Sequence, residues 1–308
     1  DPRPGIPPRA NTLAEQDAAW WNGPLYRNEE LIERPADQTT LTRRYTDEAV
    51  KFIQANKAKP FFLYFPHTFP HTPLFASKDF AGKSPRGIFG DVVEELDASV
   101  GKVLDTLRQE KLAENTLVFF TSDNGPWLIM NQQGGSAGLL RDGKGSTWEG
   151  GMRVPGIAWW PGKIKAAQTQ RTLASTMDLF TTSLKLAGAD VPADRPIDGV
   201  DIRPLLFGTG TVSREAYFYY RGTRLMAARA GDFKAHFMTQ SAYGQPKHEE
   251  HPVPLLFNLK VDASETFNVA TNHPAVLSQI AQAVEKHKAA LQPAPSQLLE
   301  VQPLPEKK

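Results

Sequence analysis

The sequence predicts an α/β fold in which a mixed, largely parallel sheet is flanked by helices, followed by a smaller C-terminal α+β domain. Strand-like apolar runs alternate with helical periodicity over residues 41–208, and several short strand-like segments then precede a last helix. The 308 residues, 40% hydrophobic and 22% charged, suffice to bury a large core. We expect an extended segment, an α/β core, a smaller domain and a tail at residues 1–40, 41–208, 209–292 and 293–308.

Two amphipathic helices are expected in the first half of the core. Residues 40–57 place their apolar side chains on one helical face, and residues 91–112 repeat apolar side chains at steps of three and four. Asp91 followed by Glu94 resembles a capping arrangement, so we expect the second helix to begin there.

The strands of the core are expected where short apolar runs end in turn-forming residues. These runs are PFFLYF at 60–65, TLVFF at 116–120 and GIAWW at 156–160, and a further helix is expected at 171–187. In the smaller domain, REAYFYY, RLMAARA, DFKAHFM and PLLFNL predict successive strands, and residues 273–291 predict the terminal helix.

Composition excludes several classes of function. The formal net charge of +1 gives no basic field for nucleic acid or an anionic membrane, and no apolar run approaches the roughly 18 residues that span a bilayer. The absence of cysteine excludes disulfides, thiolate metal sites and a cysteine nucleophile within these residues. Neither a nucleic-acid partner nor a membrane partner is therefore expected.

Polar residues follow two of the predicted strands at their carboxyl ends, where open α/β sheets bind ligands. The first group is the loop His67–His71, and the second is Asp123 with Asn124 in TSDNGPW. Carboxylate and amide oxygens are hard ligands suited to calcium or magnesium. The same residues are also common turn formers, so the pattern alone leaves a metal site and a simple turn both open.

Three further groups invite a functional interpretation. Lys144 lies between two glycines, which leave room for a lysine to approach an anion. The same pattern is also typical of a solvated surface loop. Glu149 and Arg153 bracket two glycines and are expected to form a structural ion pair. The stretch His248-Glu-Glu-His251 lacks the spacing that would place both histidines on one helical face, so zinc is not expected there.

Six stretches, in order, resemble an arylsulfatase of the sulfatase family in the alkaline phosphatase superfamily. They are PFFLYFPHTFPHTPLFAS, GDVVEELDASVGKVLDTL, NTLVFFTSDNGP, GLLRDGKGSTWEGGMRVPGIAWWPG, DGVDIRPLL and PLLFNLKVDASETFNVA, and they span about residues 25–272. The resemblance implies a sulfuric ester hydrolase acting on a small sulfated or aryl ester, with calcium as cofactor, or magnesium in its place. It also implies a periplasmic or secreted location.

The resemblance also assigns roles to individual residues. Asp123 and Asn124 would complete a calcium site, while His71 and Lys144 would contact the substrate sulfate and act as catalytic residues. An imidazolium at His71 could donate a proton to the leaving oxygen, which suits sulfate ester cleavage. His251 lies where relatives place a histidine near the substrate pocket, and His67 stays unassigned.

The sequence departs from the family at its nucleophile. Relatives carry a formylglycine made from the first residue of a Cys/Ser-x-Pro-x-Arg motif, and an early Asp-Asp pair completes their calcium site. Neither the motif nor the Asp-Asp pair occurs in this sequence. Ser84-Pro85-Arg86 contains the same residue types but lacks the spacing of the motif. A second lysine and a histidine of the same N-terminal half are also absent.

Three explanations of this departure remain open. The chain is one piece of a full enzyme whose separate N-terminal sulfatase fragment holds the nucleophile, which is the explanation that we favour. Alternatively, it is a truncated, metal-assisted hydrolase of carboxylic or phosphate esters, or a non-catalytic remnant that binds sulfate or a sulfated ligand. The first is favoured because central strands would be missing, which would expose apolar edges and faces.

Overall fold

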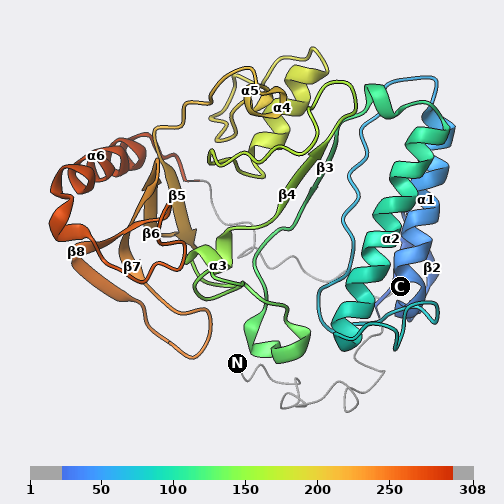
Figure 1. The fold of residues 1–308 in the computed structure, drawn as a ribbon, viewed down its shortest axis with the longest axis horizontal. Helices are drawn as coiled ribbons and strands as arrows, with labels where there is room; N and C mark the ends of the chain where they lie inside the picture. The colour runs from blue at the N-terminus through green and yellow to red at the C-terminus, as the bar shows by residue number, and fades with distance from the viewer. Residues whose placement is uncertain (1–22, 294–308) are drawn as a thin grey trace, which may run out of the picture. The chain divides into compact units, whose positions relative to one another are not determined.

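A computed structural model describes residues 23–293 of the chain, and these residues form two compact units (Figure 1). The first unit comprises residues 23–136 and 154–210, and the second comprises residues 137–153 and 211–293. The segment 137–153, expected in the α/β core, therefore groups with the C-terminal strands. Residues 1–22 and 294–308, including the expected tail, lie outside the described residues.

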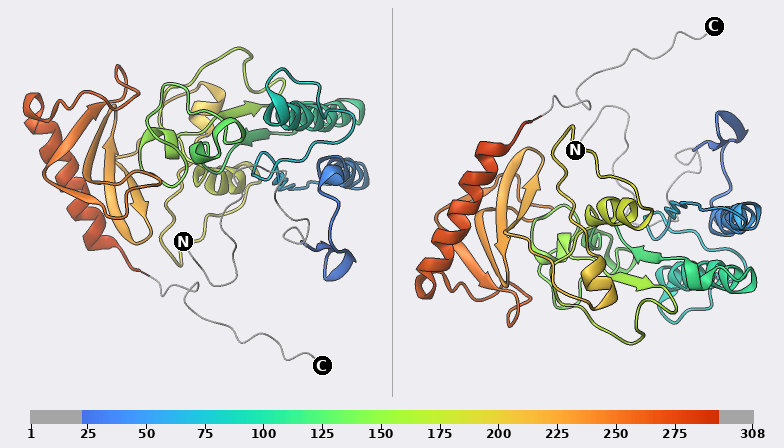
Figure 2. Two further views of the ribbon diagram at one scale, coloured as in Figure 1. Left: turned by 90° about the horizontal axis from the view of Figure 1, so that it is seen from below. Right: turned by 90° about the horizontal axis from the view of Figure 1, so that it is seen from above.

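The first unit is built around a pair of long helices and a two-stranded sheet. Helix α1 (Leu41–Asn56) packs along α2 (Gly87–Gln109), as all views in Figures 1 and 2 show. Strand β3 (Val118–Thr121) pairs with β4 (Gly156–Trp159). The shorter elements are the hairpin β1–β2 (Leu25–Arg27, Glu30–Glu33), the 3-10 helices η3 (Gln38–Thr40), η4 (Ala113–Asn115) and η5 (Leu128–Gln133), and the α-helices α4 (Asp178–Leu186) and α5 (Arg203–Phe207).

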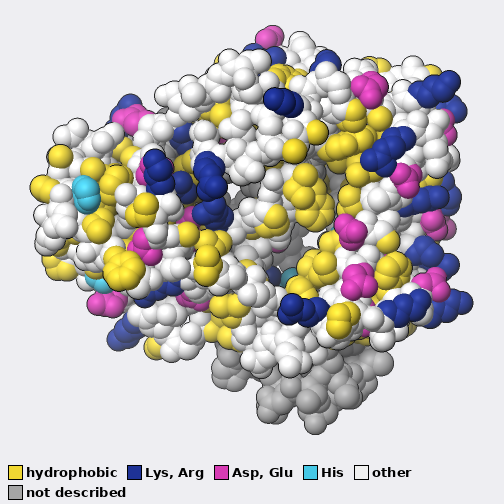
Figure 3. All heavy atoms as spheres, in the orientation of Figure 1, with side chains coloured by type: hydrophobic (Ala, Val, Ile, Leu, Met, Phe, Trp, Pro, Cys, Tyr) yellow, Lys and Arg dark blue, Asp and Glu magenta, His cyan; other side chains and the backbone are white. Residues whose placement is uncertain are grey.

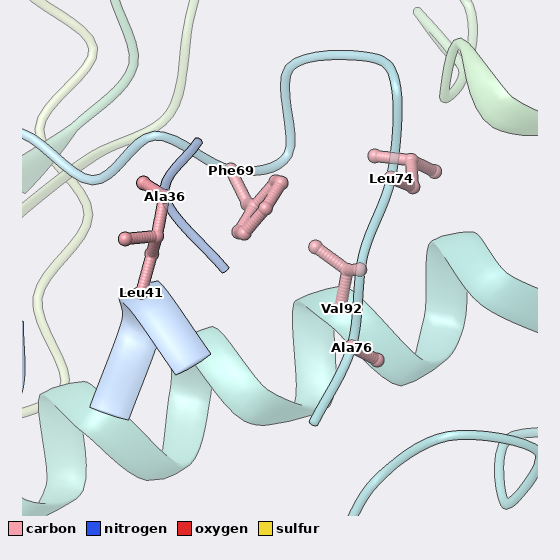
Figure 4. Packing of buried hydrophobic residues seen from close by; sticks show 6 residues of the cluster. All are labelled: Ala36, Leu41, Phe69, Leu74, Ala76 and Val92. Atoms are coloured by element: carbon pink, nitrogen blue, oxygen red, sulfur yellow. The ribbon is translucent and has the colours of Figure 1, made fainter. Parts of the chain in front are cut away.

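Apolar residues from both helices and from the loop between them form one core of the first unit. Figure 4 shows this cluster, in which Phe69 and Leu74 of the loop face Leu41 and Val92 of the helices, with Ala36 and Ala76 beside them. The helices also share a buried polar contact, because Thr46 Oγ1 lies 2.5 Å from Ser99 Oγ. The loop that carries His71 is therefore held on the helix pair by its own apolar side chains.

The second unit is a four-stranded antiparallel sheet covered on one face by a helix (Figure 2). Strands β5 (Tyr217–Arg221), β6 (Arg224–Ala230), β7 (Phe233–Thr239) and β8 (Glu249–Asn258) pair in sequence order. Helix α6 (Pro274–Ala290) follows the turn η6 (Ala270–Asn272) and buries Ile280 and Val284 against the sheet. The short helix α3 (Glu149–Met152) belongs to the same unit. The antiparallel sheet and terminal helix expected here are confirmed.

The prediction of a strand at residues 60–65 is wrong, because these residues pair with no strand within the described part of the chain. Their backbone has no assigned strand, although burial alternates with period two and leaves Phe62 and Tyr64 75% and 78% exposed. The parallel pairing is likewise not found within residues 23–293, since β3 and β4 run antiparallel. Apolar periodicity reports which side chains face inward, but a strand also needs a hydrogen-bonded partner.

The start of the second long helix also differs from the expectation. Helix α2 begins at Gly87, and Asp91 lies inside it rather than at its cap. The Asp91 carboxylate instead accepts hydrogen bonds from the backbone N–H groups of Gly82, Lys83 and Ser84, at 2.7–3.0 Å. These bonds lower the pKa of Asp91, Ser84 making the largest contribution.

The remaining differences concern the extent of elements. Residues 25–33, expected to be extended, form the hairpin β1–β2, and the helix expected from residue 171 begins at Asp178. The Asp178 carboxylate accepts the backbone N–H groups of Ser175 and Val200, which holds the preceding turn outside the helix. No helix within the described range is both long enough and apolar enough to cross a membrane.

Candidate functional site

The carboxyl end of β3 presents two hard oxygen donors on adjacent residues. Asp123 is exposed and Asn124 half-buried, and the two form a bend that begins two residues after the last strand residue, Thr121. The Asn124 side chain donates Nδ2–H to the carbonyl of Gly125 at 2.9 Å, which directs its Oδ1 away from that carbonyl. One carboxylate and one amide oxygen suit calcium or magnesium but supply too few ligands for either ion.

The donor set fits a hard cation only as part of a larger site. Among the described residues, no group of three or more histidine, aspartate or glutamate side chains is arranged to hold a metal ion. Calcium takes about six to eight oxygen ligands, so water, substrate or further protein oxygens would have to complete the shell.

His71 lies on the loop between α1 and α2, which the apolar cluster shown in Figure 4 holds in place. It is exposed and lines a pocket of about 280 Å³ with Gln38, Thr68, Phe69, Thr72 and Pro73. Its Nδ1 lies 2.7 Å from the carbonyl oxygen of Thr72. Because a carbonyl can only accept, Nδ1 carries a proton, and Nε2 is the nitrogen that can exchange one with a ligand.

The structure brings the His71 loop close to the segment that follows β3. The ring of His71 lies 5.7 Å from the ring of Trp127, measured between centroids. Trp127 follows Asn124 by three residues, so the His71 loop contacts the segment that carries Asp123 and Asn124.

Lys144 belongs to the second unit and sits in a glycine-dependent turn. The Ser146 N–H donates to the Gly143 carbonyl at 3.1 Å, which closes a turn with Lys144 and Gly145 at its centre. Gly145 has φ +94°, a conformation that favours glycine, so the flanking glycine is needed to hold the lysine in this turn. Lys144 is half-buried.

His251 lies on β8 of the second unit, where it is half-buried and contacts the neighbouring strand. Its Nε2 lies 2.9 Å from Thr239 Oγ1 on β7. His248, which belongs to the sequence that superficially resembles a zinc motif, contacts Glu250 at 3.2 Å. A substrate contact by His251 therefore stays a prediction, and its observed contact ties two strands together.

His67 is more buried than His71 and is neutral, so it is not suited to binding a sulfate. Burial lowers its pKa to about 4, so it carries no charge at neutral pH. Its Nε2 lies 3.4 Å from Ser99 Oγ, a long contact beneath the loop. The exposed His71 is therefore better placed than His67 to contact a sulfate.

Sequence reasoning missed a buried ionic cluster in the second unit. Glu149 pairs with Lys234 at 3.0 Å and approaches Arg229 at 3.8 Å, which corrects the expected pairing with Arg153. Lys234 also lies 3.1 Å from Glu265. The sequence signal for this cluster was a lysine and a histidine at alternate positions of DFKAHF, which face the same side of a strand. Their partners could not be identified, because they are distant in sequence.

Comparison with known proteins identifies homologues along most of the chain. The profile of the family described as Sulfatase matches residues 8–189, and that of the C-terminal region of aryl-sulfatase matches residues 212–307. N-acetylgalactosamine-6-sulfatase of Canis lupus familiaris is 43% identical over 312 residues, covering 90% of this chain and 60% of the relative. Steryl-sulfatase of Homo sapiens is 39% identical, with 89% and 52% covered.

A solved sulfatase from Pseudoalteromonas superposes with a TM-score of 0.76 at 30% identity, covering 82% of this chain and 53% of that protein. A Bacteroides thetaiotaomicron protein described in connection with glycosaminoglycan metabolism gives 0.73 at 32% identity, with 82% and 55% covered. These likenesses confirm the expected sulfatase-like fold class. The chain spans about 60% of the length of the first curated relatives that it matches. It belongs to the sulfatase family.

Proposed function

We propose that this chain supplies the sulfate-binding part of a sulfuric ester hydrolase site, including half of a calcium site. The observation that carries the proposal is the meeting of the His71 loop with the segment after β3, which presents Asp123 and Asn124. Family membership supports it, because the relatives are named as sulfatases.

The proposed chemistry divides the work among charged groups. Asp123 and Asn124 would hold calcium, or magnesium in its place, and the bound cation would offset negative charge on the sulfate. Lys144 would bind a sulfate oxygen, and His71 would transfer a proton to the leaving oxygen through Nε2. The Thr72 carbonyl supports this role because it fixes the proton on Nδ1 and so orients the ring.

In this proposal the nucleophile comes from residues beyond these 308, because sulfatases form theirs on cysteine or serine in a motif that this sequence lacks. We propose that a further sulfatase segment, carried on the same polypeptide or on a separate one, supplies it. The exposed side chains of Phe62, Tyr64 and Ile157 support this, because their apolar area would be covered by such a segment. Figure 3 shows hydrophobic side chains gathered over β3, β4 and the adjoining side of α2.

The calcium half-site is tested by titrating the chain with calcium chloride and following thermal unfolding of the first unit. We expect stabilisation that is lost in Asp123→Ala and Asn124→Ala. The matched control is Asp97→Ala, an exposed acid on α2, which should keep the wild-type response. Equal stabilisation of the wild type and the two site variants would refute the metal role.

The sulfate role is tested with sodium sulfate by calorimetry and with 4-nitrophenyl sulfate, phosphate and acetate as substrates. His71→Ala and Lys144→Ala should each weaken sulfate binding at least tenfold, whereas Lys260→Ala, an exposed lysine of the second unit, should not. Turnover of the phosphate or acetate ester alone by the wild type would favour the alternative hydrolase. Sulfate binding without turnover of any ester, even with the nucleophile-bearing segment present, would favour a binding remnant.

A further inference from the structure

A cluster of charged side chains is fully enclosed in the second unit. The Lys234 ammonium donates to the Thr147 carbonyl at 2.8 Å and to Glu149 Oε1 at 3.0 Å, and lies 3.1 Å from Glu265 Oε1. His236 Nε2 lies 2.6 Å from the same Glu265 oxygen. The side chains of Lys234, Glu265 and His236 are 0% exposed, so these contacts are shielded from bulk solvent.

The charges in this cluster balance when His236 is neutral. Burial, aided by the nearby Lys234 charge, lowers the pKa of His236 to about 4 despite the opposing effect of Glu265. Burial alone would raise the pKa of Glu265, yet its bonds with His236 and Lys234 lower it, so Glu265 is ionised. The two carboxylates then face Lys234 and Arg229, with neutral His236 donating its Nε2–H to Glu265.

This cluster holds both ends of the loop that carries Lys144. At one end, the Arg141 guanidinium donates to the Glu265 carbonyl at 2.9 Å and stacks 3.7 Å above the Trp148 ring. At the other end, the Glu149 N–H donates to Glu265 Oε2 at 2.6 Å, and Lys234 binds the Thr147 carbonyl. The five residues 142–146, between Arg141 and Thr147, are therefore held at both ends by the same cluster of charged side chains.

Two further contacts fix the interior of the loop. Asp142 Oδ2 accepts the backbone N–H of Ala242 at 3.0 Å, which ties the residue before Gly143 to the segment after β7. A Cβ at Gly150 would lie 2.2 Å from the Asp142 carbonyl oxygen, so the loop backbone is in direct contact with α3. The turn with Lys144 at its centre has little freedom to reorient while these contacts persist.

Stability alone does not account for charges at this place. Burying two carboxylates and an ammonium is costly, and apolar residues of similar volume often serve stability as well or better. Charged partners do provide orientation, since one ammonium with three donors fixes a carbonyl and two carboxylates at once.

We propose that Lys234, with Glu149 and Glu265, is a positioning group that holds the Lys144 turn in the orientation needed to bind a sulfate. The inference rests on the sulfate-binding role proposed for Lys144. Lys234 acts through the loop backbone and touches no substrate, since its ammonium is occupied by Thr147, Glu149 and Glu265.

The test uses the charge-balanced variant Lys234→Met/Glu149→Gln, which removes one positive and one negative charge and keeps the side-chain volumes close. Glu265→Gln serves as a second variant if the first does not fold. The control is Ile280→Val, which loosens the core beneath α6 without touching the loop. Hydrogen exchange of peptides covering residues 141–151 and the affinity for sodium sulfate are measured for each protein.

We expect exchange of the amides at 146, 149 and 150 to quicken at least tenfold in the cluster variant, and its affinity for sulfate to fall at least tenfold. Ile280→Val should leave both within twofold of wild type. Unchanged loop exchange in a folded cluster variant would overturn the positioning role, and so would a quickened loop with unchanged sulfate affinity while Lys144→Ala loses binding. If Lys144→Ala binds sulfate like wild type, the proposed function fails and the sulfate part of this inference fails with it, whereas the exchange data still decide whether the cluster holds the loop.

Discussion

Substituting alanine for glycine is predicted to have opposite effects at two helical positions of this chain. Gly101 lies within α2, and a Cβ built there meets no atom within 4 Å. Gly101→Ala removes backbone freedom from the unfolded chain and should stabilise the first unit by about 0.5–1 kcal/mol. Gly150 lies in α3, where a Cβ would stand 2.2 Å from the Asp142 carbonyl oxygen and 2.4 Å from that of Arg141.

The cost at Gly150 follows from those distances. Real Cβ contacts are essentially never shorter than 3.0 Å, so the facing backbone must retreat by at least about 0.8 Å. That movement stretches the 2.8 Å hydrogen bond from the Gly150 N–H to the Arg141 carbonyl, worth about 1 kcal/mol. Overpacking adds about 1–3 kcal/mol, so Gly150→Ala should destabilise the second unit by about 2–4 kcal/mol.

The measurement has to report on the two units separately, because a single unfolding free energy is not defined for units that unfold independently. Hydrogen exchange of peptides from each unit, followed at increasing urea, provides this. Gly101→Ala should slow exchange only in the first unit, and Gly150→Ala should quicken it only in the second. If Gly150→Ala were neutral or stabilising, the close contact between α3 and the 141–142 backbone would be refuted.

Three further predictions concern the core, the pH response and the exposed apolar side chains. Leu256→Ala should destabilise the second unit by about 2–5 kcal/mol in urea unfolding, since Leu256 is fully buried under α6; a cost below 1 kcal/mol would contradict that burial. As pH falls from 6.5 to 4, the second unit should lose up to about 3 kcal/mol, because the unfolded state protonates His236 at its ordinary pKa of 6.5 while the folded state resists until about 4. His236→Gln should flatten that slope, and an unchanged slope would assign it to other groups. Phe62→Thr with Tyr64→Thr should change stability by less than about 0.5 kcal/mol yet weaken association with a complementary sulfatase segment in size-exclusion chromatography; equal association would remove them from the proposed contact.

Features encoded within one stretch of sequence were predictable. The apolar periodicity of α1 and the run of β-branched and aromatic residues in β3 each carry their own signal, as do the strands of the second unit. The adjacent donors Asp123 and Asn124 were found in the same way, because a polar turn after an apolar strand is a local pattern. Their metal role remains a proposal.

Features that depend on distant residues were not predictable. PFFLYF has the composition of a strand, yet strand formation depends on a hydrogen-bonding partner that its own residues do not specify. Glu149 was matched with the nearby Arg153, whereas its partner Lys234 lies 85 residues away. Glu265, 116 residues from Glu149, carries no local mark of its buried role.

The central claim is that this chain contributes part of a sulfatase site and that the nucleophile lies on further residues. It is tested most directly by isolating the natural protein under native conditions, measuring intact masses and assaying 4-nitrophenyl sulfate with and without calcium. We predict calcium-dependent hydrolysis by a species in which these residues accompany a formylglycine-bearing segment, on one longer chain or on a separate one. Hydrolysis of the sulfate ester by a lone 34.1 kDa chain would contradict the account.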